Sequence, residues 1–333
     1  GGQKSDVGII SNKTFRFMVK DVQQLGNSII HFGNIDFGSI KVGDSVNTSV
    51  NEINRNNTAI HHSATHLLHQ SLREILGKHV QQRGSLVSNN HLRFDFTHKK
   101  ALTDNDILNI EKNVNDEISL NKKTIIQTMN YESAIKKGAL AFFDEKYTDT
   151  VRVLKIGSKS CELCGGTHIK SSSDIKLFKI ISESSISSGV RRIEAVAGDS
   201  AVKNYQQVFY NNKELSHSLN VNQDLLPQKI EEIKGNVHNV ENKISILNNQ
   251  LSQQIVYSMD SKKVLSGTTS VFIEDCSEFE TDLIKMILDK IKNSYDNSIS
   301  ILIKNQNDHI SMFVGVSKSC EHIYNAKQII NQI

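Results

Sequence analysis

Polar and apolar residues change their spacing several times along the chain, and each change marks a different predicted element. Residues 1–55 contain short alternating or β-branched runs, such as TFRFMVKDV and SIIHFG, separated by glycine and asparagine. This pattern predicts antiparallel strands that form a small β-barrel. The alternative interpretation is a β-rich accessory domain that carries no chemistry.

A mixed pattern follows in residues 56–199. Apolar residues recur at helical spacing from Asn57 to Gly77, which predicts an amphipathic helix that stops at the glycine. A second helix is predicted in LTDNDILNIEKNVNDEISL, with Thr103 as its N-cap. The runs GSLV, HLRFDF, TVRVLKIG, IKLFKIISES and VRRIEAVAG are typical of strands. Helices and strands in this order predict an α+β domain that ends near Gly198.

Residues 200–260 change to a heptad pattern. Apolar residues spaced alternately four and three apart form an a/d seam over about four heptads: Leu226, Ile230, Ile233, Val237, Val240, Ile244, Leu247 and Leu251. The seam predicts a coiled-coil arm, and its many asparagines make it a weak helix that needs a partner. The partner is either residues 200–219 folding back or another subunit. Residues 261–333 return to strand and helix patterns and predict an α/β domain, which we expect to be truncated.

Composition narrows the class of protein. The net charge is only +3, so a nucleic-acid surface must be a local patch. Four scattered cysteines are too few for a disulfide scaffold, which favours a reduced, cytoplasmic setting. No run reaches the roughly 18 apolar residues of a membrane span, so we expect no membrane partner. The chain opens on GGQKSDVG without Met, and we expect a fragment of a longer protein.

Two short motifs far apart in the sequence carry candidate metal chemistry. His62 and His66 lie four apart on the first predicted helix, so both side chains project from one face. Cys164 and His168 lie in CGGTH, whose glycines allow the chain to fold both side chains toward one point. Together they make a plausible tetrahedral zinc set. The spacing of the two histidines alone is a weak signal.

Other residues offer rival interpretations of the same motifs. His61 and His69 are alternative ligands on the helix, and His69 is more typical of a solvated or supporting group. Cys161 and Cys164 form a CxxC pair that is compatible with redox chemistry or a zinc knuckle. A second CxxC and a thioredoxin-like context are absent from the sequence, so Cys161 is better interpreted as a strand-end residue that packs behind the turn.

These motifs carry a family resemblance. HHSATHLLHQSLREILG, HVQQRGSLVSNNHLRFDFTH, CELCGGTH and SGVRRIEAVAG resemble the editing domain of the alanyl-tRNA synthetases. The order of barrel, editing core, coiled coil and C-terminal domain is also similar to that family, although the match is weaker past residue 200. We expect the aminoacylation domain, which binds ATP and Mg²⁺, to lie upstream and to be missing here.

The resemblance implies roles for individual residues. It implies that His62, His66, Cys164 and His168 hold one Zn²⁺. It also implies that Thr65 recognises the misattached amino acid and that Gln82 belongs to the same pocket. Without the resemblance, Thr65 is interpreted as a hydroxyl bonded to its own helix backbone and Gln82 as a surface residue. Because four protein ligands are typical of structural zinc, we expect the ion to order the pocket and position the substrate.

The implied reaction is hydrolysis of the ester between tRNA(Ala) and wrongly attached serine or glycine. Arg93, Arg191 and Arg192 alternate with apolar residues on predicted strands and are candidate contacts to tRNA phosphates. The alternative is that they lie on solvated strand faces or form ion pairs with Asp95 and Glu194. A homodimer through the coiled coil or the C-terminal domain is also expected.

Two other functions remain open from the sequence. One is a free-standing or threonyl-type aminoacyl-tRNA deacylase, which uses the same set of three histidines and one cysteine as metal ligands. The other is a non-catalytic, zinc-stabilised module for tRNA binding and dimerisation, which predicts bound zinc and tRNA but no turnover.

Overall fold

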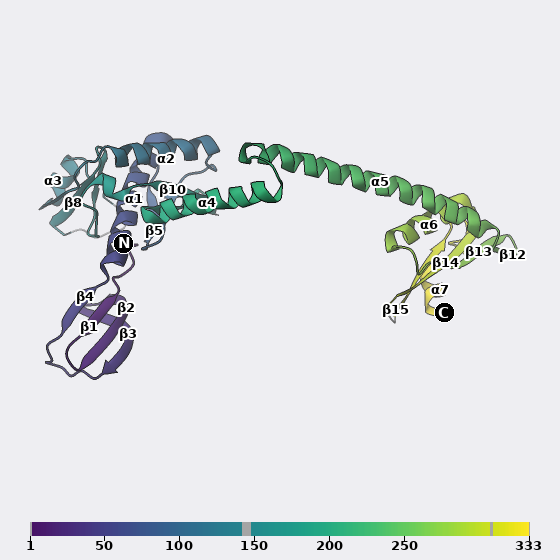
Figure 1. The fold of residues 1–333 in the computed structure, drawn as a ribbon, viewed down its shortest axis with the longest axis horizontal. Coiled ribbons are helices and arrows are strands. Elements are labelled where there is room, and N and C mark those ends of the chain that lie inside the picture. The colour runs from purple at the N-terminus through teal and green to yellow at the C-terminus, as the bar shows by residue number, and fades with distance from the viewer. Residues whose placement is uncertain (1, 142–147, 307–308, 333) are drawn as a thin grey trace. The chain divides into compact units, whose positions relative to one another are not determined.

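The computed structural model describes residues 2–141, 148–306 and 309–332. The chain divides into two compact units, Gly1–Asn212 and Lys213–Ile333 (Figure 1). Helices and several separate sheets are mixed along the chain, as the sequence predicted. Each unit has its own hydrophobic core.

The N-terminal strands form an open antiparallel sheet in the order β3-β2-β1-β4. Their bounds are β1 Gly8–Ser11, β2 Phe15–Leu25, β3 Ser28–Gly38 and β4 Asn47–Val50. Among the described residues no pairing joins β3 to β4, so the expected barrel is not closed. Two of the strands have only four residues, and even small barrels need about five strands to curl into closure.

The larger part of the first unit is an α+β layer structure. Its main sheet has the antiparallel order β10-β11-β6-β5, and a smaller sheet has the order β7-β8-β9. The strands are β5 Gln82–Val87, β6 Leu92–Thr97, β7 Ile125–Asn130, β8 Thr150–Ile156, β9 Ser160–Leu163, β10 Phe178–Ser187 and β11 Val190–Ala197. The helices are α1 Glu52–Leu76, α2 Asp104–Ser119, α3 Tyr131–Lys136 and the 3-10 turn η1 Ser172–Ile175.

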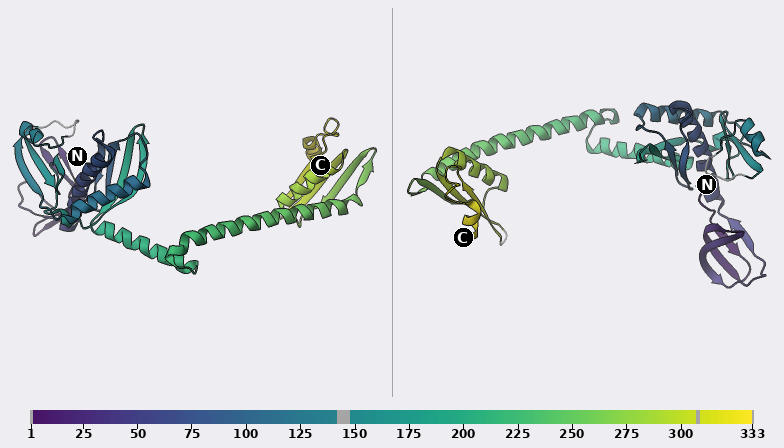
Figure 2. Two further views of the ribbon diagram at one scale, coloured as in Figure 1. Left: turned by 90° about the horizontal axis from the view of Figure 1, so that it is seen from above. Right: turned by 180° about the vertical axis from the view of Figure 1, so that it is seen from behind.

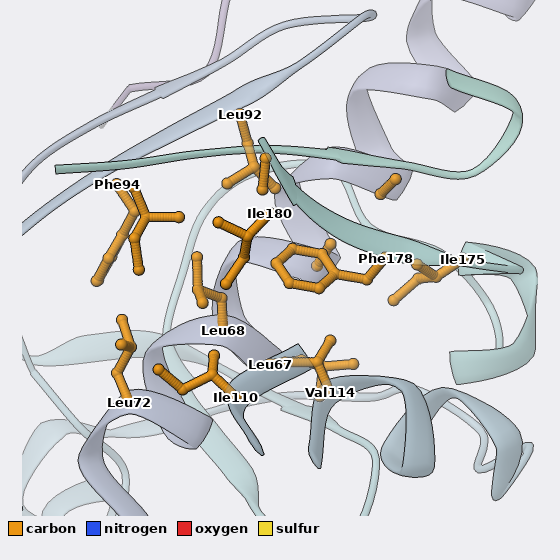
Figure 3. Packing of buried hydrophobic residues seen from close by; sticks show 14 of the residues in the cluster. Leu67, Leu68, Leu72, Leu92, Phe94, Ile110, Val114, Ile175, Phe178 and Ile180 are labelled. Carbon is orange, nitrogen blue, oxygen red and sulfur yellow. The ribbon is translucent and has the colours of Figure 1, made fainter. Parts of the chain in front are cut away.

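Helix α1 packs against α2, the main sheet and the small sheet, and supplies the centre of the core. Figure 3 shows Leu68 and Leu72 of α1 beside Ile110 of α2 and Ile180 of β10. All four side chains are buried. Because this face of α1 is locked by packing, the polar residues of its other buried face are held in fixed positions.

The ends of the two main helices are set by side-chain caps. Thr103 caps α2 in a reciprocal capping box with Asp106, which confirms the predicted N-cap. Helix α1 begins at Glu52, before the predicted start at Asn57, because the Asn51 side chain accepts a hydrogen bond from the amide of Asn54 (3.0 Å).

The second unit contains one long helix, α5 (Leu226–Asp260), shown as a single continuous rod in Figure 2. It follows α4 (Asp199–Ser218) and the 3-10 turn η2 (Gln223–Leu225), and Pro227 lies in its first turn. The predicted seam is on this helix. From Ile230 to Leu251 its apolar side chains are 38–61% exposed, so the described residues of the second unit leave a large part of each uncovered.

The remainder of the second unit is a sheet in the order β12-β13-β14-β15, in which only the β13–β14 pair is parallel. The strands are β12 Val264–Ser266, β13 Thr269–Asp275, β14 Ser298–Gln306 and β15 His309–Val316, and the helices are α6 Thr281–Ser294 and α7 Ala326–Gln332. Val256 and Met259 at the end of α5 pack with α6 in this core. No described helix has the length and apolar character that a bilayer crossing requires.

Candidate metal centre

The two sequence motifs meet in the first unit. His62 and His66 project from α1, and Cys164 and His168 come from the turn that follows β9. One ligand atom from each lies within 4.8 Å of all the others. Cys164 Sγ is 3.5 Å from His62 Nε2 and 3.3 Å from His168 Nε2. In a tetrahedral zinc site ligand atoms are about 3.3–3.8 Å apart, given bonds of about 2.0–2.3 Å, so the cluster fits that ion.

The three histidines are oriented through their other ring nitrogens. His62 Nδ1 is 2.8 Å from Gln3 Oε1, His66 Nδ1 is 2.5 Å from Glu162 Oε2, and His168 Nδ1 is 3.1 Å from Ser63 Oγ. Amide and carboxylate oxygens accept hydrogen bonds, so Nδ1 carries the proton in the first two rings. Each Nε2 is thereby directed at the cluster, which is the usual arrangement behind a metal-bound histidine.

One buried atom of the cluster lacks a partner. His66 Nε2 has no hydrogen-bond partner among the described residues, although the side chain is only 5% exposed. A buried polar nitrogen left in this way costs free energy unless a ligand satisfies it. The donor set, the ring orientations and this nitrogen all fit a zinc ion held by the four residues.

Burial and mutual hydrogen bonds set the charges of the ligands. Burial lowers the pKa of His62, and it lowers the pKa of His168 to about 4, so both rings are neutral near pH 7. Burial acts to raise the pKa of the Cys164 thiol, but its polar contacts with His168 and His62 outweigh burial and lower that pKa to about 3. The cluster therefore presents a thiolate at Cys164 and neutral imidazoles at His62 and His168, which are the forms that bind zinc.

Glu162 is the fixed charge beneath the cluster. Its two oxygens contact His66 Nδ1 and His69 Nδ1 (2.9 Å), and its side chain is 1% exposed. Burial acts to lower the pKa of His66, but the Glu162 carboxylate outweighs it and raises that pKa to about 10 without metal. The two histidines conversely hold the pKa of Glu162 far below its usual range. Zinc binding must therefore release a proton from His66.

Glu162→Gln is expected to lower zinc affinity about 10- to 100-fold, because the amide keeps the shape of the carboxylate but not its charge. The measurement is a competition titration with a zinc chelator of known affinity. Glu74→Gln is the matched control, because Glu74 is also paired with a cation but its side chain is 30% exposed. Equal zinc affinities of the two variants would contradict the orienting role.

One of the two glycines of the CGGTH turn, Gly166, packs directly against the His62 ring. A Cβ built on Gly166 would lie 2.2 Å from His62 Cε1 and 2.8 Å from Gln3 Oε1, whereas one built on Gly165 meets nothing within 4 Å. The carbonyls of Cys164 and Gly166 both accept hydrogen bonds from Arg152 Nη1 (2.7 and 2.9 Å). The turn is therefore fixed from two sides.

A pocket of about 300 Å³ opens on the cluster. It is lined by the ligands His62, His66 and Cys164, and by both residues that the resemblance placed in a substrate pocket, Thr65 and Gln82. Thr65 Oγ1 donates to the carbonyl of His61 (2.8 Å), as the backbone-bonded interpretation predicted. Gln82 Nε2 donates to Ser85 Oγ (3.2 Å).

The rival ligands are placed elsewhere. Both ring nitrogens of His61 are used, by the carbonyl of Asn57 (2.8 Å) and the amide of Ala197 (3.1 Å). His69 contacts Glu162, as expected for a supporting group. Cys161 lies on β9 and packs against the apolar cluster of the small sheet, away from the four ligand atoms.

The three candidate arginines have carboxylate partners inside the protein. Arg192 forms a two-bond pair with Asp95 (2.7 and 2.9 Å), and Arg93 lies 3.7 Å from the same residue. Arg191 pairs with Glu183 rather than with the expected partners. This is the ion-pair alternative, and contact with tRNA phosphates stays a prediction.

Sequence reasoning missed Gln3, Glu162 and Ser63 as supports of the ligands. Glu162 and Ser63 stand inside the quoted motifs CELCGGTH and HHSATH, so their position beside the ligands was the available signal. Gln3 lies in the opening segment, and no local pattern connects it with His62. Its Oε1 also accepts a hydrogen bond from the amide of Thr167 (3.1 Å).

Comparison with known families agrees with this geometry. Residues 151–194, which include Cys164 and His168, match the threonyl and alanyl tRNA synthetase second additional domain. Residues 1–54, which include Gln3, match the class II (A) tRNA synthetases. The two matches support a fragment of an alanyl- or threonyl-type tRNA synthetase. Its function is accordingly related to aminoacyl-tRNA synthesis with editing, and tRNA is the partner that this family implies.

Proposed function

We propose that this chain belongs to an alanyl-tRNA synthetase and that its first unit hydrolyses tRNA(Ala) wrongly charged with serine or glycine. The observation that carries the proposal is the single pocket that joins the zinc ligands to Thr65 and Gln82. A synthetic site that fits alanine rejects only weakly the smaller glycine and serine, which adds one hydroxyl group, so a second site is needed to remove the errors.

Each polar residue of the pocket is proposed to contact a different part of the substrate. The Thr65 hydroxyl donates its proton to the His61 carbonyl. Its oxygen can therefore accept a hydrogen bond from the hydroxyl of a seryl group. Gln82 offers its amide to the ester. When bound, zinc supplies a positive charge that orders the ligands and attracts polar groups of the substrate. Alanine presents no side-chain hydroxyl to this pocket, and such a missing hydrogen bond is a strong basis for discriminating seryl from alanyl esters. Glycine lacks the hydroxyl as well, so hydrolysis of the glycyl ester does not depend on this contact.

The test is deacylation of Ser-, Gly- and Ala-tRNA(Ala) by the chain, with and without a zinc chelator. We expect hydrolysis of the first two, little hydrolysis of the third, and loss of activity with chelator. Equal hydrolysis of all three would contradict the specificity. Preference for Ser-tRNA(Thr) would favour the threonyl-type deacylase, and tRNA binding without turnover would favour the zinc-stabilised binding module. The proposed setting is the cytoplasm.

We also propose that the exposed seam of α5 pairs with the same seam of a second copy, with the helices antiparallel. Lys229 and Lys234 flank the seam at positions that face each other in a parallel pair, where like charges repel. In the antiparallel pair Lys234 instead faces Glu241 of the second copy, twice by symmetry. The charges therefore favour the antiparallel dimer.

Val240→Asp is expected to convert the dimer to monomers, because it places two carboxylates in the apolar seam. The measurement is mass by analytical ultracentrifugation at several protein concentrations. Asn242→Asp adds the same charge two residues away, at an outer heptad position, and should leave the dimer intact. A monomeric parent chain would contradict the proposal and favour residues 200–219 as the seam's partner.

A further inference from the structure

A second pocket, of about 430 Å³, shares Gly165 and Gly166 with the first. The CGGTH turn is therefore a wall of both pockets. The second pocket is also lined by Thr167 and His168. Two arginines, Arg55 and Arg152, belong to its polar lining and supply positive charge. The apolar part of the lining comes from Ala59 and Ile126.

Arg152 is fixed in place but only partly used. Its Nη1 donates to two carbonyls of the turn, those of Cys164 and Gly166. Among the described residues its Nε and Nη2 make no hydrogen bond, and no carboxylate pairs with it. A guanidinium whose orientation is set by the backbone, with one edge still available, is pre-organised to bind an anion.

Arg55 reaches the same pocket from the first turn of α1. Its Nη1 donates to Asp6 Oδ2, and the two side chains are 45% and 30% exposed. A half-exposed pair of this kind contributes little to stability, so an incoming anion can take the place of the carboxylate at low cost. Two guanidinium groups facing one cavity are a recurrent way of binding phosphate, because each presents several parallel donors.

We infer that this second pocket binds a backbone phosphate of the 3′-terminal strand of tRNA, while the adjoining pocket holds the aminoacyl ester. The inference rests on the proposed function. The shared turn places the phosphate pocket next to the ester pocket, where the last nucleotides of the tRNA must lie. Arg152 supplies the fixed contact, and Arg55 turns from Asp6 to the phosphate.

The test is a salt series of binding of uncharged tRNA(Ala) to the full chain. Arg55→Gln should lower affinity about tenfold, the effect of losing one hydrogen-bonded charge. It should also reduce the slope of log affinity against log salt by about one. Asp6→Asn, which removes the competing carboxylate, should increase affinity instead.

The matched controls are Arg16→Gln and Asp36→Asn. Arg16 and Asp36 form an ion pair between β2 and β3 with side-chain exposures of 43% and 52%, so the change in charge and exposure is similar. Neither should alter tRNA affinity. If Arg55→Gln and Arg16→Gln behave alike, or if Asp6→Asn leaves the affinity unchanged, the inference is overturned.

Two further measurements separate a loss of phosphate contact from a damaged turn and from binding of free phosphate. The amount of zinc bound by each variant should equal that of the parent chain, which would show that the CGGTH turn is intact. If Arg55→Gln binds less zinc, its tRNA affinity is set aside and the affinity of Asp6→Asn decides the test. Inorganic phosphate at millimolar concentration should compete with tRNA only weakly; full displacement would identify free phosphate as the ligand and overturn the assignment to tRNA. Because uncharged tRNA is the probe, a failure of ester hydrolysis would contradict the proposed function without affecting this result.

Discussion

Cys164→Ala is expected to lower the zinc affinity of the chain by on the order of 100-fold or more. Structural zinc binds with roughly 10–16 kcal/mol, and four ligands share it, so each contributes about 3 kcal/mol. Deacylation of Ser-tRNA(Ala) should fall in parallel, because His62 and His168 both lose the sulfur atom near which they lie. The measurements are metal content after dialysis, chelator competition and single-turnover deacylation.

Cys161→Ala is the matched control for this experiment. Cys161 is also a free, partly buried thiol in the same motif, but it lies outside the ligand cluster. Its loss should leave zinc affinity and deacylation unchanged. Full deacylation by the Cys164→Ala protein would contradict any part for this ligand in the reaction, and equal loss from both cysteines would restore the CxxC interpretation.

Gly166→Ala is expected to displace His62 and weaken both zinc binding and folding. The new methyl group would lie 2.2 Å from His62 Cε1 and 2.4 Å from Nδ1, so either the ring or the turn must move. Overpacking of this kind costs about 1–3 kcal/mol of unfolding free energy. Chemical denaturation and zinc titration measure the two effects.

Gly165→Ala changes the neighbouring glycine and tests whether the contact, rather than the loss of a glycine, is responsible. No atom lies within 4 Å of a Cβ at this position, so the unfolding free energy should change by less than about 0.5 kcal/mol. If the two variants lose the same amount of zinc, the close approach of Gly166 to His62 is not what the site requires.

Local patterns predicted the elements and the ligands well. The 3.6-residue period of α1 and the capping box at Thr103 are properties of neighbouring residues, so a single sequence displays them. The four ligands were identifiable because helix geometry projects His62 and His66 from one face and because CGGTH concentrates two donors in five residues. Their meeting in space came from the family resemblance rather than from the pattern.

Features that depend on distant contacts were not predicted. The alternating strands of residues 1–55 were correctly expected, but closure of a barrel depends on strand number and length, which the alternation does not encode. Arg191 was expected beside Asp95 or Glu194, and it pairs with Glu183 because the register of β10 against β11 brings that residue within reach. Register is fixed by packing of the whole sheet.

The hydrogen bonds of Gln3 have a consequence for how the protein is made. The side chain that orients His62 is separated by 164 residues from the amide of Thr167 that it also holds. At about 5–20 residues per second, a ribosome needs roughly 8–30 s to synthesise the intervening chain. During that time α1 has emerged with its histidines but without the cysteine that completes the cluster. The metal centre therefore cannot assemble until the chain has been synthesised through His168, however early its helix has folded.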